Sequence, residues 1–176
     1  MEIHLRDFRQ RDFEAAWRID QQCFAPGISY SRVELAAYLR RPGAFALVAE
    51  SSAFATDPQG QGVSADGSSP SILGFIAAEC GNRNRGHIIT IDVLPGARTV
   101  GVGSRLLLAA ENRLRAANCD CVILETAVDN FAALSFYKKH EYNVVKTIPR
   151  YYSDGVDALV LKKDLLSPPW PANLPQ

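Results

Sequence analysis

Residues 87–126 constrain the fold most, because they predict a strand, a helix and a second strand in close succession. Residues 87–93 form an apolar strand pattern that a Leu-Pro-Gly sequence ends. Residues 102–117 repeat apolar side chains at helical spacing, and residues 121–126 return to a strand pattern. Such a strand–helix–strand crossover implies a parallel strand pair with right-handed winding.

The rest of the chain predicts antiparallel strands and three more helices around this unit. Ser31, followed three residues later by Glu34, fits a helix-capping box. Further strands are expected at residues 2–6, 45–50, 72–79, 142–152 and 156–163, the last two joined by a turn at 153–155, and further helices at 12–24, 31–41 and 130–139. We therefore expect an α/β fold whose mixed, mostly antiparallel sheet has a central parallel strand pair and helices on both faces.

The length of the chain corresponds to one domain. The sequence has 176 residues, and we place the domain at residues 1–166. Residues 51–71 are rich in Ser, Gly and Pro, so they cannot bury enough apolar area to offset the entropy of ordering. We expect a mobile insertion loop there, between the two arms of a hairpin, and an irregular proline-rich tail at residues 167–176.

The charge balance argues against a nucleic-acid partner. The 19 Lys and Arg side chains cancel the 19 Asp and Glu side chains, whereas nucleic-acid domains usually show a basic excess. No segment approaches the roughly 20 apolar residues that span a bilayer. The first residues also lack the pattern of a signal peptide. We expect a cytoplasmic protein without a membrane partner, as a monomer or a homodimer.

The cysteines and histidines do not have the spacing of a metal site. They are Cys23, Cys80, Cys119, Cys121, His4, His87 and His140. One residue separates Cys119 from Cys121, instead of the two residues of a zinc knuckle. We expect four reduced thiols and three histidines with structural roles.

The loop between the first strand of the crossover and its helix is a candidate anion site. Gly101 and Gly103 let backbone N–H groups converge, and the start of the helix adds the positive end of its dipole. A dinucleotide fingerprint would need glycine where Leu106 stands, and a mononucleotide P-loop would need lysine where Val102 stands. A nucleotide-binding domain is therefore disfavoured, and a tight turn without a ligand is the remaining alternative.

Further residues make the pattern more specific. An arginine at position 98, two residues and then Gly-x-Gly open the helix, and Glu125, Asn130 and Tyr137 follow in the next strand and helix. With Arg150-Tyr151-Tyr152 and Asp157-Ala158, this sequence resembles the GNAT superfamily of acyl-CoA-dependent N-acetyltransferases. It looks most like the bacterial ribosomal-protein alanine N-acetyltransferases and related N-terminal acetyltransferases. The likeness covers most of residues 2–166, with the specific motifs in 87–164.

The resemblance implies a single-domain enzyme that uses acetyl-CoA, and it assigns cofactor-binding roles. These fall on the backbone at the end of the first crossover strand, on the glycine loop and on the following helix: Ile91, Asp92, Val93, Arg98, Thr99, Val100, Gly101, Val102, Gly103, Ser104, Asn130 and Ala133. Core packing of Ile91 and Val93, and an ordinary helix-capping role for Asn130, are compatible alternatives.

The resemblance also implies the catalytic residues. Glu125 would be the general base that acts on the incoming ammonium, and Tyr137 the general acid for the departing thiolate, in a direct transfer without an acyl-enzyme. A glutamate that faces solvent and a tyrosine packed on the sheet are the alternatives. One departure from the family is Glu141, which stands where glycine is usual and leaves the end of that helix in question.

Two loops, residues 25–31 and 149–155, are expected to border the acceptor amine. They carry Tyr30, Tyr151 and Tyr152 but only one carboxylate, whereas a polyamine site would present several. Hydrogen-bonding tyrosines suit a peptide, so we expect a protein or peptide α-amino group as acceptor. A small-molecule amine, and a non-catalytic acyl-CoA-binding module on the same fold, remain the alternatives.

Overall fold

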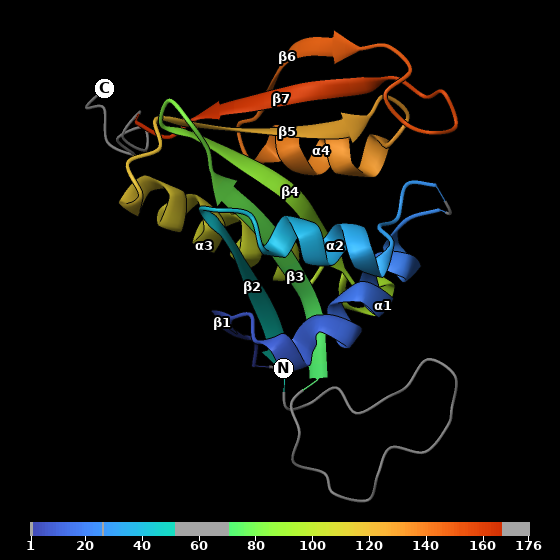
Figure 1. Cartoon of the computed structure of the whole chain (residues 1–176), viewed down its shortest axis with the longest axis vertical. Coiled ribbons are helices and arrows are strands. Elements are labelled where there is room, and N and C mark those ends of the chain that lie inside the picture. Colours follow the sequence, from blue (N-terminus) through green and yellow to red (C-terminus); the bar gives the residue numbers. More distant parts are fainter. Residues whose placement is uncertain (1, 26, 52–70, 167–176) are drawn as a thin grey trace, which may run out of the picture.

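The computed structural model describes residues 2–25, 27–51 and 71–166 of the chain (Figure 1). Within these residues the strands are β1 His4–Asp7, β2 Ala44–Ser51, β3 Ser71–Cys80, β4 Arg85–Val93, β5 Cys121–Ala127, β6 Asn143–Ile148 and β7 Ala158–Asp164. The helices are α1 Phe13–Cys23, α2 Arg32–Leu39, α3 Val102–Ala116 and α4 Phe131–Lys139, with short 3₁₀ turns at Gln10–Asp12 and Pro95–Ala97. Most of these bounds agree with the sequence analysis to within two residues.

The strands form one sheet in the order β1-β2-β3-β4-β5-β7-β6. β4 and β5 are parallel, as the crossover predicts, and every other neighbouring pair is antiparallel. β2 and β3 are the two arms of the expected hairpin, with Ser51 paired to Ser71. The residues between them, and those after 166, lie outside the described part of the chain, so the expected insertion loop and tail are not tested.

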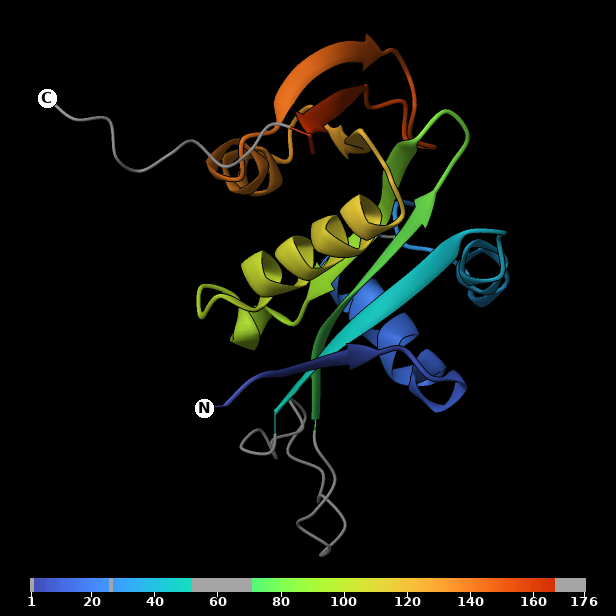
Figure 2. The same ribbon diagram turned by 90° about the vertical axis from the view of Figure 1, so that its left-hand side faces the viewer.

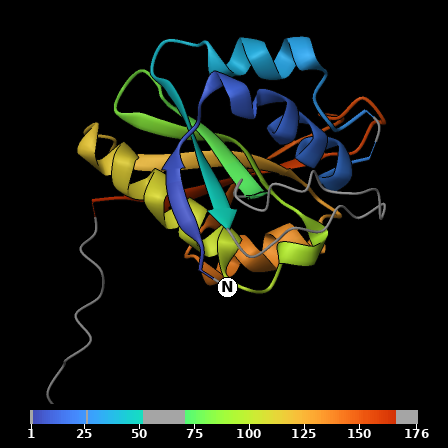
Figure 3. The same ribbon diagram turned by 90° about the horizontal axis from the view of Figure 1, so that it is seen from below.

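Helices cover both faces of the sheet, so the expected fold class is confirmed. α1 and α2 lie on one face, and α3 and α4 on the other (Figures 2 and 3). Phe75 and Val48 point toward α1 and α2, and Ile76 and Ile88 lie in the larger cluster with α3. Both faces of the central strands are therefore buried, which explains their long apolar runs.

The predicted turn at 153–155 is present, because the Gly155 N–H bonds to the Tyr152 carbonyl at 2.9 Å and the Tyr152 N–H bonds to the Val156 carbonyl at 3.1 Å. The predicted strands on either side of it are too long. β6 ends at Ile148 and β7 begins at Ala158, so a longer loop joins them. Pro149 has no backbone N–H to donate to a ladder. Arg150 has a positive φ of 50°, and its N–H bonds to the Asp157 side chain at 2.8 Å. This local geometry replaces strand pairing and leaves the tyrosines of this segment in a loop.

Glu141 ends α4 in the conformation that glycine normally supplies. Its φ is +68°, and its N–H bonds to the carbonyl of Lys138. The N–H of Tyr142 bonds back to the carbonyl of Tyr137 at 3.0 Å. These two bonds form a Schellman motif with glutamate in place of glycine. The helix end is thus preserved, at the cost of a left-handed backbone at a non-glycine residue.

Within the described residues, no helix combines the length and the apolar character needed to cross a membrane.

Candidate active site

The parallel strands β4 and β5 separate to form a fork. They pair only from Arg85 to His87 on β4 and from Cys121 to Ile123 on β5. Beyond this point β4 continues along β3, while β5 continues along β7 (Figure 1). The inner edges of the two strands therefore diverge in the middle of the sheet. Ligands of open α/β sheets bind at such strand ends.

A β-bulge at Ile89 lies at the start of the fork. Ala77 pairs with Thr90 and Ala78 with Ile88, which leaves Ile89 as an extra residue in β4. The bulge shifts the alternation, so Ile88, Ile91 and Val93 all contribute to the core on the α3 face. The expected core packing of Ile91 and Val93 is present, and their backbone lies along the fork.

The glycine loop presents an uncapped helix end beside this strand. Gly101 is the N-cap of α3 with a left-handed φ of 89°, and no side chain caps the helix. Gly103 faces Phe136 of α4, and a Cβ there would lie 3.4 Å from the ring. The first-turn N–H groups have no intrahelical partners and carry the positive end of the dipole. These residues fit a pyrophosphate group.

The two flanking residues of the loop make local contacts. The Arg98 Nε donates to the Val93 carbonyl at 3.1 Å, so this arginine joins the loop to the end of β4. Thr99 has a positive φ of 69° and bonds to the carbonyl of Arg98. Val100 is exposed, as suits a loop that acts through its backbone.

α4 contributes three of the predicted residues. Asn130 is its N-cap and accepts the Ala133 N–H at 3.1 Å, so the ordinary capping role is present. Two turns later Tyr137 is buried, and within the described residues its hydroxyl makes no hydrogen bond. Burial, with Asp92 and Tyr152 nearby, raises the pKa of Tyr137. The hydroxyl is protonated at neutral pH, as in any tyrosine, and can act as a donor.

The side chain of Asp92 points away from α3. It is buried, and its Oδ1 accepts from the Thr90 hydroxyl at 2.9 Å. Its Oδ2 has no partner in the described part of the chain. Burial and the charge of Asp20 raise the pKa of Asp92 well above its usual value. Any contact of this residue with a cofactor thus falls to its backbone.

Glu125 is held by a histidine to which the sequence analysis assigned only a structural role. The His87 Nε2 lies 2.7 Å from Glu125 Oε2, and the His87 Nδ1 lies 3.5 Å from Glu79 Oε1. Burial lowers the pKa of His87, but hydrogen bonds and the charges of Glu125 and Glu79 outweigh it, so the net shift is upward. A carboxylate–imidazole pair of this kind can accept a proton.

The signal for this pair was present in the sequence. His87 and Ile123 are register neighbours in the parallel pair, and Glu125 lies two residues further on the same face of β5. The sequence did not give the register of β4 against β5, which brings the two side chains together. A histidine at the start of the fork strand is therefore a better indicator of function than histidine spacing alone.

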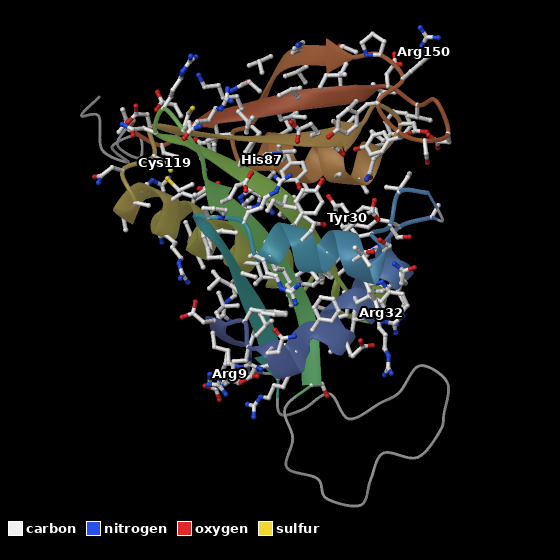
Figure 4. All side chains as sticks on the ribbon, viewed as in Figure 1. Arg9, Tyr30, Arg32, His87, Cys119 and Arg150 are labelled. Carbon is white, nitrogen blue, oxygen red and sulfur yellow. The ribbon has the colours of Figure 1, made fainter. Side chains whose placement is uncertain are left out.

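The two loops that are expected to border the acceptor contact each other near the fork. The Ser153 hydroxyl of the β6–β7 loop donates to the carbonyl of Gly27, between α1 and α2, at 2.8 Å. Two hydrogen bonds fix the position of Tyr30. Its N–H bonds to the buried Asp20, and its hydroxyl donates to the Ile89 carbonyl at 3.3 Å. Figure 4 shows Tyr30 and His87 on the same side of the molecule.

The other two predicted tyrosines contact each other near Glu125. The Tyr151 and Tyr152 rings are edge-to-face with centroids 5.1 Å apart. Burial raises the pKa of both, and the nearby charge of Glu125 adds to the shift. Arg150 points outward from the end of this loop (Figure 4). The structure therefore brings the three tyrosines, Glu125 and His87 to one side of the fork.

Comparison with known proteins identifies relatives over most of the chain. The acetyltransferase (GNAT) family model matches residues 13–142. An N-alpha-acetyltransferase of Sulfolobus acidocaldarius is 41% identical over 85 residues, which cover 46% of this chain and 49% of that protein. The chain thus spans 49–59% of the length of the first curated relatives that it matches.

Solved structures extend the similarity to the whole fold. Ard1 of Thermoplasma volcanium has a TM-score of 0.76 with 26% identity, covering 95% of this chain and all of that one. The ribosomal-protein-S18-alanine N-acetyltransferase of Escherichia coli has a TM-score of 0.74 with 18% identity, covering 98% of this chain and 100% of that one. The resemblance to the alanine acetyltransferases is therefore one among several, and the archaeal relatives are more similar in sequence. The chain belongs to the acetyltransferase (GNAT) family.

Proposed function

We propose that this protein transfers the acetyl group of acetyl-CoA to the α-amino group at the N-terminus of a peptide or protein. The observation that carries the proposal is the fork, where a carboxylate–imidazole pair faces one side and an uncapped helix N-terminus lies on the other. The donor and the acceptor can then approach the same point from opposite sides of the sheet.

The donor side uses backbone groups. The first-turn N–H groups of α3, from the Val102-Gly103-Ser104 segment, would hold the pyrophosphate. The backbone at Ile91 and Val93 would lie along the pantetheine arm, with Ala133 and Asn130 on the other side. Acetyl-CoA supplies an activated acyl group, which leaves the protein to orient it and to manage protons.

The acceptor side uses side chains. An ammonium that enters beside Glu125 loses a proton to the Glu125–His87 pair, directly or through one water. The nitrogen lone pair then attacks the acyl carbon in a direct transfer. Tyr137 donates its proton to the sulfur of the leaving group, since its hydroxyl is protonated at neutral pH.

A peptide is favoured as acceptor by the composition of the loops. Tyr30, Tyr151 and Tyr152 present aromatic walls and hydroxyl groups, and Asp154 is the one carboxylate of these loops. The names of the archaeal relatives, N-alpha-acetyltransferases, support the same class of acceptor. An alanine N-terminus on a ribosomal protein is one member of this class and is not preferred over others.

The test is acetylation of a defined peptide library, in which the second and later residues vary, next to a panel of polyamines and amino sugars. CoA release measures turnover, and mass spectrometry locates the acetyl group. We expect acetylation at the α-nitrogen of a subset of peptides. Fast acetylation of a free amine with every peptide untouched would give the small-molecule alternative, and CoA binding without any turnover would give the non-catalytic module.

Glu125→Gln provides a check on the assigned base. We expect its rate to fall mainly below the pKa of the acceptor amine, because a base is needed there to remove the ammonium proton. The pH profile of kcat/KM measures this. A loss of equal size at every pH would instead assign Glu125 a positioning role.

A further inference from the structure

The imidazole of His87 lies between two carboxylates. Glu79 on β3 is the cross-strand partner of His87 on β4, and its Oε1 lies 3.5 Å from Nδ1. Glu125 on β5 lies 2.7 Å from Nε2 on the opposite side of the ring. The three side chains thus form a row across three neighbouring strands. The Glu79 and Glu125 side chains are 17% and 19% exposed, so neither is fully hydrated.

The far end of the row opens to solvent. A pocket of about 600 Å³ is lined by Glu79, His87 and Ile123 together with the β3–β4 turn. This pocket lies on the side of His87 away from the acceptor loops, because residues of the β3–β4 turn line it: Gly81, Asn82, Arg83 and Arg85. Arg41, which follows α2, also bonds to Glu79 Oε1 at 3.2 Å and is half-exposed.

The proposed reaction leaves one proton to be disposed of. An ammonium acceptor loses two protons on its way to an amide; one restores the Tyr137 hydroxyl after it has protonated the thiolate of CoA, and the other must reach water. The acceptor side of the fork is covered by the loops that meet at Ser153 and Gly27. The pocket beside Glu79 offers a separate exit.

We propose that Glu79 is a positioning residue for the proton-accepting pair. It holds the Nδ1–H of His87 so that Nε2 and Glu125 share a proton across their 2.7 Å contact, and it stabilises the imidazolium until a proton leaves through the pocket. In this step the N–H bond of the ammonium breaks and its electron pair stays on nitrogen. The proton passes to the Glu125–His87 pair and then to pocket water. The inference rests on the proposed function, which it deepens.

The charged groups around His87 determine whether a substitution raises or lowers its pKa. The negative charges of Glu79 and Glu125 favour the imidazolium. The positive charge of Arg41, which bonds to Glu79, opposes this effect, and Arg85 lines the same pocket. Removing Glu79 should therefore lower the pKa of His87, and removing Arg41 should raise it. A carboxylate at this distance shifts a neighbouring pKa by about one unit.

Glu79→Gln keeps the shape of the side chain and removes its charge. We expect the acidic limb of the kcat/KM profile to move to lower pH by about one unit, because the base now loses its proton more easily. The plateau rate should fall about tenfold, since a weaker base accepts a proton less well. The KM for acetyl-CoA should not change, and NMR titration of the His87 ring should show the same pKa shift without substrate.

Arg41→Met is the opposing variant. It should move both the acidic limb and the His87 titration to higher pH. Glu50→Gln is the matched control, because the Glu50 side chain has the same 17% exposure and also loses one arginine partner, Arg6, on β1. It should leave the pH profile of kcat/KM and the His87 titration as in the unmodified protein.

The outcome separates the two proposals. If the unmodified protein acetylates peptides but Glu79→Gln and Arg41→Met leave the acidic limb and the His87 titration in place, the role of Glu79 is excluded and the proposed function stands. If the unmodified protein acetylates no peptide, the proposed function fails, while the His87 titration still reports whether Glu79 holds the imidazole.

Discussion

The donor side and the acceptor side of the fork are built in different ways. On the proposed donor side, one continuous segment, residues 98–104, would form the anion site from its own backbone. On the acceptor side, Tyr30, His87, Glu125 and Tyr152 come from four separate segments and meet through tertiary contacts. A site made of backbone depends on local conformation, whereas a site made of distant side chains depends on register and loop packing. Mutations on the two sides should therefore change different kinetic constants.

Tyr137→Phe should have the largest effect, because Tyr137 is the proposed general acid at the point where the two substrates react. Loss of a general acid lowers turnover by about 10²-fold or more. The KM for each substrate should change little, since the ring remains buried at the same place. Steady-state kinetics with both substrates varied measures this. Unchanged turnover would mean that water protonates the thiolate.

Gly101→Ala should affect the donor side alone. The left-handed φ of 89° costs a non-glycine residue about 1–2 kcal/mol, which corresponds to roughly tenfold weaker binding if the loop must keep its shape. Gly96→Ala is the control, because Gly96 lacks a positive φ and a Cβ there meets no atom within 4 Å. Calorimetry with CoA should separate the two variants, and equal affinities would remove the loop from the donor site.

Ser153→Ala should change only the kinetic constant of the acceptor side, and the change should be smaller than that of Gly101→Ala. It removes the hydroxyl that donates to the Gly27 carbonyl, a bond worth about 1 kcal/mol. We expect the KM for the peptide to rise about threefold to fivefold while the KM for acetyl-CoA stays constant. Ser29→Ala, on the same α1–α2 connection, is the control. A change in the donor constant would show that the two sides are coupled through these loops.

Glu141→Gly should change neither side, and so tests whether stability and activity separate. The variant relieves the left-handed backbone at φ +68° and should stabilise the protein by about 1 kcal/mol, or about 2–4 °C in Tm. Glu141→Ala removes the carboxylate but keeps the strain, so it should bring less stabilisation. Thermal unfolding measures both, and equal gains would mean that charge at the helix end, and not backbone strain, is the cause.

The same contrast explains how much the sequence could predict. Gly101, Gly103, Asn130 and Tyr137 were placed by local patterns, because helix caps and seven-residue spacing do not depend on distant contacts. The His87–Glu125 contact was not predicted, because it follows from the register of β4 against β5.

Two further features of the site also depend on tertiary structure. The bulge at Ile89 reverses which side chains of β4 face α3, so the sequence could place Asp92 on its strand but not on its face. The tyrosines of the loop after Ile148 have high β propensity and so favour a strand there. Pro149, and the hydrogen bond that the Arg150 N–H donates to the Asp157 carboxylate, prevent strand pairing.

The most direct test of the proposed function is a crystal structure with a bisubstrate ligand, in which CoA is joined through an acetyl group to the α-nitrogen of a short peptide. The proposed function predicts the pyrophosphate at the first turn of α3, the α-nitrogen between Glu125 and Tyr137, and the peptide between the loops that carry Tyr30 and Tyr152. A ligand whose phosphates lie away from residues 98–104, or whose peptide lies outside the fork, would contradict it.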